Sequence, residues 1–257
     1  MSFEGTPHAQ PGAECWLAAV LGNTHVRWGW FQDQTLIKVE LFSAQQPLPW
    51  PDQTELWLAA VGAAPVPTGS AWVHQLQLQD VPLGNHYPTL GLDRALALWA
   101  AGIHHGWPCL VIDAGTALTF TGADPEGSLV GGAILPGLGL QAQALSDHTA
   151  QLPKIDWDPG SPLPPRWAKD TPTAIRSGIL YTVLAGVRSF IADWRQDFPE
   201  SAVLLTGGDG IWLDRALEDP RVVWDPDLVL KGIAGCRQTA YARMPHPRQV
   251  TPRPLEG

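Results

Sequence analysis

One segment, residues 110–122, constrains this chain more than any other. It starts with an apolar run of three residues, Leu110 to Ile112, which predicts a buried β-strand. The run ends at Asp113, and a turn with Gly115 and Thr116 leads into a second alternating strand. An acid and a hydroxyl beside an open backbone amide can hold a cation and the phosphate oxygens of a nucleotide. A plain β-hairpin turn is the alternative interpretation.

Two further turns favour the nucleotide. Residues 16–31 again predict a strand, a turn of Gly22, Asn23 and Thr24, and a second strand. Residues 202–206 predict a strand that runs into Gly207 and Gly208, followed by a helix over 211–217. Paired glycines let the backbone lie flat against a ring such as adenine, because no Cβ intrudes. The three turns in this order predict a nucleotide held between two lobes.

This order resembles the superfamily of actin, the Hsp70 chaperones and the sugar kinases. The resemblance implies an α/β chain with the two-lobed actin-like (ribonuclease H-like) ATPase fold, in which helices flank mixed sheets. We place the N-terminal lobe at residues 15–106 and the C-terminal lobe at 107–243. Residues 1–14 and 244–257, rich in proline and glycine or in proline alone, are expected to be loose tails.

Within that superfamily, three motifs resemble the type III pantothenate kinases. They are Gly91-Leu-Asp-Arg94, Asp113-Ala-Gly-Thr-Ala117 and Gly131-Gly-Ala-Ile-Leu-Pro-Gly137, and the resemblance extends over about residues 16–240. It implies ATP-dependent phosphorylation of pantothenate to 4′-phosphopantothenate, the first step of coenzyme A biosynthesis. Two alternatives stay open: a catalytically weak or silent relative that acts as an accessory or regulatory nucleotide-binding protein, and a kinase for another small hydroxy acid.

The first turn departs from the family pattern. The family usually has an acid two residues before the glycine, and Val20 stands there in this chain. Valine cannot bind magnesium, so either the ion is held by ATP with water and Asp113, or this chain binds the nucleotide less well than its relatives. This departure is the feature that favours a catalytically silent relative, whereas the intact Gly-Leu-Asp-Arg turn favours the enzyme.

The resemblance assigns the acceptor side of the site. Asp93 would be the catalytic base, although an Asp at the start of a helix can equally be an N-cap. Arg94 could pair with the substrate carboxylate. The full set of expected pantothenate contacts is Gly91, Leu92, Asp93, Arg94, Thr171 and Tyr87.

The resemblance also assigns the nucleotide and cation contacts. Asp113 would bind a monovalent cation, K⁺ or NH₄⁺, and Mg²⁺ would enter with ATP. Arg27 could contact phosphate, or it could simply face solvent from its strand. The expected ATP contacts are Val20, Leu21, Gly22, Asn23, Thr24, His25, Val26, Arg27, Thr116, Gly207 and Gly208.

Thr171 bears on the oligomeric state of the protein. In many family members the matching threonine reaches the substrate across a dimer interface, so the resemblance implies a homodimer. The alternative is that Thr171 caps its own helix. His104 and His105 are adjacent and have no third ligand at metal spacing, so we interpret them as polar loop residues.

The composition of the chain indicates which partners and which cellular compartment to expect. Apolar residues make up 45% of the chain and charged residues 16%, which is typical of a globular protein with a substantial core. The net charge of −9 argues against nucleic acid as a partner. Three cysteines without metal-site spacing, no signal peptide and no continuous apolar span predict a cytoplasmic protein without a membrane partner.

The remaining elements follow from periodicity and from Gly and Pro. Residues 155–168 hold too much Pro and Trp for regular structure. A linker is expected at 62–70, an edge strand at 71–78, and a helix at 94–101 that ends at Gly102. Other strands are expected near 35–42, 55–61 and 129–134, and other helices at 138–145, 173–195 and 231–243.

Overall fold

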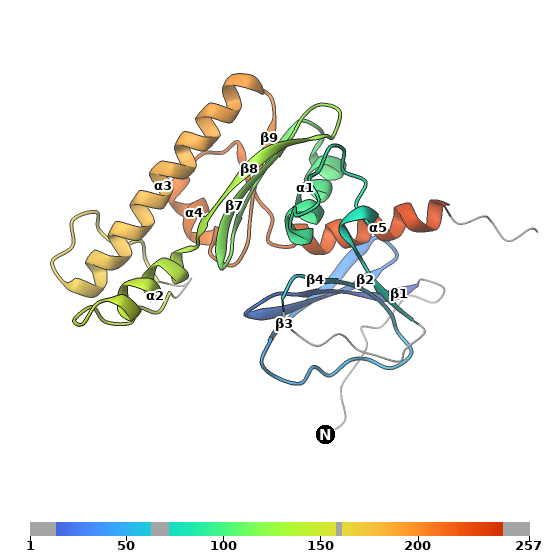
Figure 1. Ribbon diagram of the computed structural model, residues 1–257, viewed down its shortest axis with the longest axis horizontal. Helices are drawn as coiled ribbons and strands as arrows, with labels where there is room; N and C mark the ends of the chain where they lie inside the picture. Colours follow the sequence, from blue (N-terminus) through green and yellow to red (C-terminus); the bar gives the residue numbers. More distant parts are fainter. Residues whose placement is uncertain (1–13, 63–71, 158–160, 244–257) are drawn as a thin grey trace, which may run out of the picture.

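The computed structural model describes residues 14–62, 72–157 and 161–243, which form two five-stranded mixed sheets with helices (Figure 1). This confirms the α/β actin-like fold class at the level of architecture. The tails expected at 1–14 and 244–257 and the linker at 62–70 lie outside the described residues, apart from Glu14 and Gly62.

The first sheet has the strand order β3-β2-β1-β4-β5. Strands β1 to β3 form an antiparallel meander, and β4 and β5 add in parallel on the other side of β1. The edge strand expected over 71–78 is shorter, because a 3₁₀ turn, Leu78–Asp80, follows it. The strands are β1 Cys15–Leu21, β2 His25–Gln32, β3 Thr35–Ser43, β4 Glu55–Ala60 and β5 Val73–Gln75.

The second sheet repeats this plan, with the order β10-β9-β6-β7-β8. Here β6 pairs antiparallel with β7 and parallel with β9, so β6 corresponds to β1. The β1–β2 and β6–β7 turns are therefore counterparts in the two sheets. Strand β10 was not predicted. The strands are β6 Cys109–Ala114, β7 Ala117–Ala123, β8 Leu129–Pro136, β9 Ala202–Thr206 and β10 Val222–Trp224.

Two helices join the sheets. Helix α1, Leu92–His105, and helix α5, Leu228–Arg243, pack on each other between the two sheets (Figure 1). One core includes apolar side chains from both sheets and both helices: Trp16, Leu96, Val111, Leu204 and Ile233. Helix α5 also contacts β1 and β4, although its sequence lies in the segment assigned to the C-terminal lobe. The lobe boundary stays a prediction.

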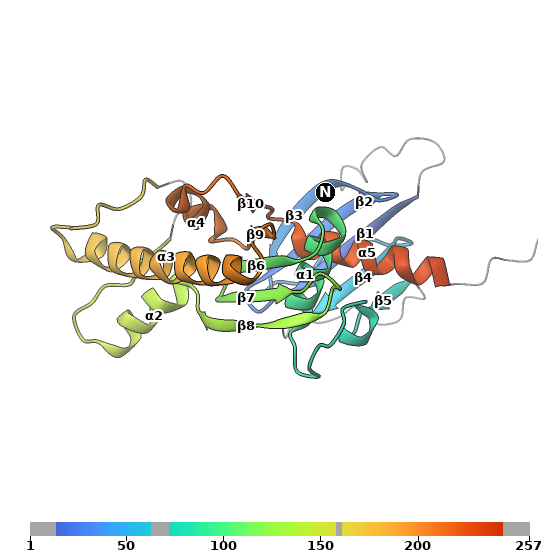
Figure 2. The ribbon, with the colours of Figure 1, turned by 90° about the horizontal axis from the view of Figure 1, so that it is seen from above.

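Helices α2 (Leu138–His148), α3 (Thr171–Asp197) and α4 (Gly210–Leu217) complete the second lobe (Figure 2). Helix α3 is the one helix of the described residues that is long and apolar enough to cross a membrane. Its side chains at spacings of four are buried in a second core, and a core helix of a globular protein passes the same test. These side chains are Ile175, Ile179, Val183 and Val187.

The predicted end of α1 is wrong. The helix continues through Gly102, which lies against the indole of Trp107 where a Cβ would not fit. It ends instead at Gly106, whose φ of 89° is in the left-handed region that favours glycine. His104 and His105 consequently belong to the last turn of the helix rather than to a loop.

Candidate active site

Two turns that are distant in the sequence meet at the junction of the sheets. Oγ1 of Thr24 in the β1–β2 turn lies 3.4 Å from Oγ1 of Thr116 in the β6–β7 turn. Both threonines are exposed, and the N–H of Gly22 donates to the carbonyl of His25 at 3.0 Å to close the first turn. The structure thus brings together the two turns that we predicted to hold phosphates.

The flanks of the first turn divide into exposed and buried positions. Asn23 and His25 are exposed beside Thr24. The side chains of Leu21 and Val26 are fully buried in the core of the first sheet, so only their backbone atoms could face a nucleotide. Within this turn, the side chains that are free to contact ATP are therefore the exposed ones at its tip, from Asn23 to His25.

Val20 stands directly opposite Arg27 in the antiparallel β1–β2 pair. Val20 is half-buried and packs against the core that joins the sheets. Position 20 therefore adds an apolar side chain, and no metal ligand, next to a cationic strand position. The structure therefore has no carboxylate at the position where the family usually has an acid.

Arg27 is half-buried and paired with Asp227, at 2.5 Å between Nη2 and Oδ1. Its Nε is buried and has no hydrogen-bond partner among the described residues. The expectation of a simply solvent-facing arginine is therefore wrong, whereas contact with phosphate stays a prediction. Asp227 was missed, because it lies 200 residues further along the chain and no local pattern pairs it with β2.

Asp113 is the second-last residue of β6 and lies opposite Thr206 of β9. The pKa of its carboxyl is raised to about 7, mainly by burial and also by the nearby negative charge of Asp93, while the positive charge of Arg27 acts in the opposite direction. Asp113 forms no ion pair within the described residues. A carboxylate that is withdrawn from water beside a second acid, without its own cation, suits a bound cation.

The glycine turn after β9 fits against this acid. Gly207 has a φ of 88°, and a Cβ there would lie 2.5 Å from Oδ1 of Asp113 and would also overlap the carbonyl of Ala114. The N–H of Asp209 donates to the same carbonyl at 2.9 Å. At Gly208, by contrast, a Cβ would meet open space. The packing of the protein thus requires glycine at position 207. At Gly208 it does not, and the space beside the backbone there is open.

Asp93 lies in the first turn of α1. The N-cap of this helix is Gly91, not Asp93, and no side chain bonds to the cap position. Oδ1 of Asp93 accepts from the N–H of Arg94 at 2.8 Å. A Cβ at Gly91 would lie 2.7 Å from the same oxygen, so Gly91 makes room for the carboxylate of Asp93. Neighbouring Leu92 packs on the core and contributes no polar group.

Arg94 is buried, and three hydrogen bonds fix its guanidinium. It donates to Oγ1 of Thr121 at 3.0 Å, to the hydroxyl of Tyr87 at 3.0 Å and to the carbonyl of Phe120 at 3.1 Å. No carboxylate of the described residues pairs with it. A Cβ at Gly132 would lie 2.5 Å from Nη2, which gives the Gly131-Gly132 motif a role that the sequence did not reveal.

Thr171 is the first residue of α3 and is exposed. Asp170 is the N-cap, because its carboxylate accepts from the N–H of Thr173 at 2.9 Å, so the interpretation of Thr171 as the cap is wrong. The start of α3 lies at the far end of the second lobe from α1 (Figure 1). A single chain therefore does not bring Thr171 to Asp93.

The described residues contain no group of three His, Cys, Asp or Glu side chains that could hold a metal ion by themselves. A divalent ion at this site would have to take most of its ligands from phosphate oxygens and water. Asp113 fits a monovalent cation better, since such an ion needs fewer charged ligands.

The duplicated sheets with paired turns at their junction define a chain of the actin-like and sugar-kinase fold class. Two solved structures share the fold. A Baf family protein from Campylobacter jejuni matches with a TM-score of 0.61 at 20% identity, over 88% of this chain and 99% of its own. A protein from Sinorhizobium meliloti named as a 2-dehydro-3-deoxygalactonokinase matches with a TM-score of 0.57 at 12% identity, over 92% and 100%.

The chain belongs to the type III pantothenate kinase family. The family model matches residues 68–193. A type III pantothenate kinase of Synechococcus sp. (strain JA-2-3B'a(2-13)) is 72% identical over 93% of this chain and 95% of that protein. One from Synechocystis sp. (strain PCC 6803) is 43% identical over 85% and 89%. These relatives support the enzyme and give no support to an accessory protein without activity.

Proposed function

We propose that this chain transfers the γ-phosphoryl group of ATP to the primary hydroxyl of pantothenate, giving 4′-phosphopantothenate and ADP. The observation that carries this proposal is the position of Asp93 beside Asp113, next to two turns that meet at Thr24 and Thr116. Phosphoryl transfer depends on positioning the reactants and on offsetting charge. This site offers a base for the acceptor hydroxyl, an acid for a cation and two turns for the phosphates, all close together.

Asp93 acts as the base. Its carboxylate takes the proton of the acceptor hydroxyl while that oxygen forms a bond to the γ-phosphorus, and the bond from the γ-phosphorus to the bridging oxygen of ADP breaks. The backbone N–H of Arg94 holds one carboxylate oxygen in place, which leaves the other for the substrate. Positioning of the two oxygens in line supplies most of the remaining rate.

Asp113 holds a monovalent cation, K⁺ or NH₄⁺, which offsets negative charge on the phosphates. Mg²⁺ would enter with ATP and supply positive charge to the phosphates, and Val20 would offer it no ligand. Arg27 supplies a further positive charge for the phosphates. Its ion pair with Asp227 holds the guanidinium in place. The Gly22–Thr24 turn and Thr116 bind phosphate oxygens, and the backbone at Gly208 faces the adenosine.

Arg94 and Tyr87 bind the carboxylate of pantothenate. A guanidinium has five N–H donors, and three of those of Arg94 are used within the protein. The positive charge is buried without a carboxylate partner in the described part of the chain. An anionic substrate group supplies the missing partner.

The working unit is a homodimer in which Thr171 completes the pocket of the neighbouring subunit. Its exposure at the start of α3, remote from α1 within one chain, supports this arrangement. The enzyme works in the cytoplasm with no membrane or nucleic-acid partner. The three free cysteines and the net charge of −9 support that placement.

The direct test is product formation. Purified chain is incubated with ATP, Mg²⁺, K⁺ and pantothenate, and 4′-phosphopantothenate is detected by mass spectrometry. The Asp93→Asn variant is the matched control. Turnover with a different small hydroxy acid, and none with pantothenate, would replace the substrate assignment while leaving the phosphotransferase intact.

A further inference from the structure

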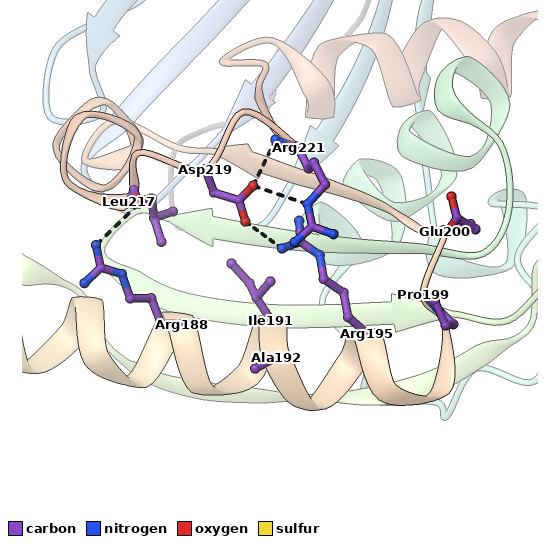
Figure 3. A pocket seen from close by; sticks show the side chains of 9 residues that line it. All are labelled: Arg188, Ile191, Ala192, Arg195, Pro199, Glu200, Leu217, Asp219 and Arg221. Carbon is purple, nitrogen blue, oxygen red and sulfur yellow. Dashed lines mark hydrogen bonds and ion pairs between the residues drawn. The ribbon is translucent and has the colours of Figure 1, made fainter.

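One cavity of the protein lies away from the candidate active site. A cavity of about 570 Å³ lies between α3 and the segment that links α4 to β10 (Figure 3). Small-molecule sites in proteins commonly fall in this size range. In Figure 3 one face of α3, with Arg188, Ile191 and Arg195, forms one wall, and Leu217 to Arg221 form the other. None of the expected pantothenate or ATP contacts lines it.

The cavity is positively charged in a negatively charged protein. Its lining has three arginines, Arg188, Arg195 and Arg221, against two acids, Asp219 and Glu200, which leaves one excess positive charge. The chain as a whole carries −9. Such a local reversal of sign concentrates small anions at the cavity.

The protein positions these arginines without using all their donors. Arg188 donates to the carbonyl of Ala216 at 2.9 Å, and Nη1 of Arg195 donates to Oδ2 of Asp219 at 2.6 Å. Nη2 of Arg195 is buried and has no hydrogen-bond partner among the described residues. The side chain of Arg221 is 67% exposed and reaches Asp219 at 3.6 Å.

We propose that this cavity binds a small phosphate monoester. The guanidinium of Arg221 would hold the phosphoryl oxygens, since it is exposed and the planar fork of arginine matches phosphate geometry. Arg195, whose side chain is largely buried, would add positive charge beside it. Arg188 adds positive charge, and Ile191 and Leu217 offer an apolar wall to the organic part of the ligand.

Isothermal titration calorimetry tests the site directly, with phenyl phosphate as the probe. A non-hydrolysable ATP analogue with Mg²⁺ is kept saturating, so that the probe cannot report the nucleotide site. We expect one saturable site per chain, with inorganic phosphate binding more weakly because it lacks the apolar part. Loss of one charge-assisted hydrogen bond in Arg221→Ala should weaken phenyl phosphate by about tenfold or more.

A matched control separates this site from general charge. Arg243→Ala removes the same charge at the exposed end of α5, outside the cavity, and should leave the affinity unchanged. Arg195→Lys keeps the positive charge and a cation for Asp219, so it should weaken binding less than Arg221→Ala does. Absence of a saturable signal with wild-type chain, or equal weakening in the Arg221 and Arg243 variants, would overturn the proposal. The outcome is independent of whether the chain phosphorylates pantothenate.

Discussion

A Cβ at Gly207 would lie 2.5 Å from Oδ1 of Asp113, so the turn after β9 and the acid near the end of β6 occupy adjoining space. The turn expected to face adenosine and the acid expected to bind a cation are therefore one packed unit. A change in the backbone at Gly207 moves the carboxylate of Asp113. The neighbouring Gly208 has no such contact, which makes the two glycines a matched pair.

We expect Gly207→Ala and Gly208→Ala to behave differently. Gly207→Ala combines a φ of 88° with overlap at Asp113 and should lower the free energy of unfolding by about 1–3 kcal/mol or more. Gly208→Ala should fold as the wild type but raise the KM for ATP by about tenfold, because a methyl group would crowd a bound ring. Thermal unfolding and steady-state kinetics measure both. Equal KM values for Gly208→Ala and wild type would place adenosine elsewhere.

Asp113 should make stability depend on pH. Its pKa is raised from 3.8 to about 7, so between these values the folded chain holds a proton that the unfolded chain has lost. In sodium buffer, this contribution to stability is present below about pH 4 and is lost as pH rises to about 7. Thermal unfolding from pH 4 to 8 measures it, with Asp113→Asn as the control. Parallel pH profiles for the two chains would contradict the raised pKa.

The same residue should confer a cation requirement on the reaction. With K⁺ or NH₄⁺ in place of Na⁺, turnover should increase steeply, because the larger ions lose their water at lower cost in a half-buried site. Asp113→Ala should be nearly inactive in every salt. Equal rates in sodium and potassium would remove Asp113 from this role and leave the assignment of Asp93 untouched.

Asp93→Asn should separate catalysis from folding. The amide oxygen of asparagine can still accept from the N–H of Arg94, and the helix keeps Gly91 as its N-cap, so the melting temperature should stay close to wild type. Removal of a general base costs about 10²–10⁴ in rate, and kcat should fall by that factor. A variant that retained most of its kcat would show that Asp93 serves only the first turn of α1.

The sequence predicted the turns of the site better than the long-range contacts around them. The motifs at Gly22–Thr24, Asp113–Thr116 and Gly207–Gly208 are local, since strand alternation and glycine mark them directly. The pairing of Arg27 with Asp227 is not local, because it depends on α5 returning to the first sheet. The end of α1 was missed for a similar reason: whether Gly102 stops the helix depends on Trp107 packing over it.

Thr171 supplies the test of assembly. Thr171→Val replaces the hydroxyl with a methyl group at an exposed position, and Asp170 still caps α3, so the chain should fold. If Thr171 completes a neighbour's pocket, co-expression of Asp93→Asn chains with Thr171→Val chains should restore activity. Each mixed dimer would then contain one pocket built only from wild-type residues and one with both defects. Turnover should approach half of the wild-type value per mixed dimer.

The control for this complementation is co-expression of Asp93→Asn with the double variant Asp93→Asn, Thr171→Val. No pocket in that mixture contains Asp93, so it should stay inactive at the same expression level. If Thr171 acts only within its own chain, the two defects remain in separate pockets and no recovery will occur in either mixture. Light scattering at the assay concentration adds a second reading: a fully active monomer would rule out the shared pocket and leave the kinase reaction standing.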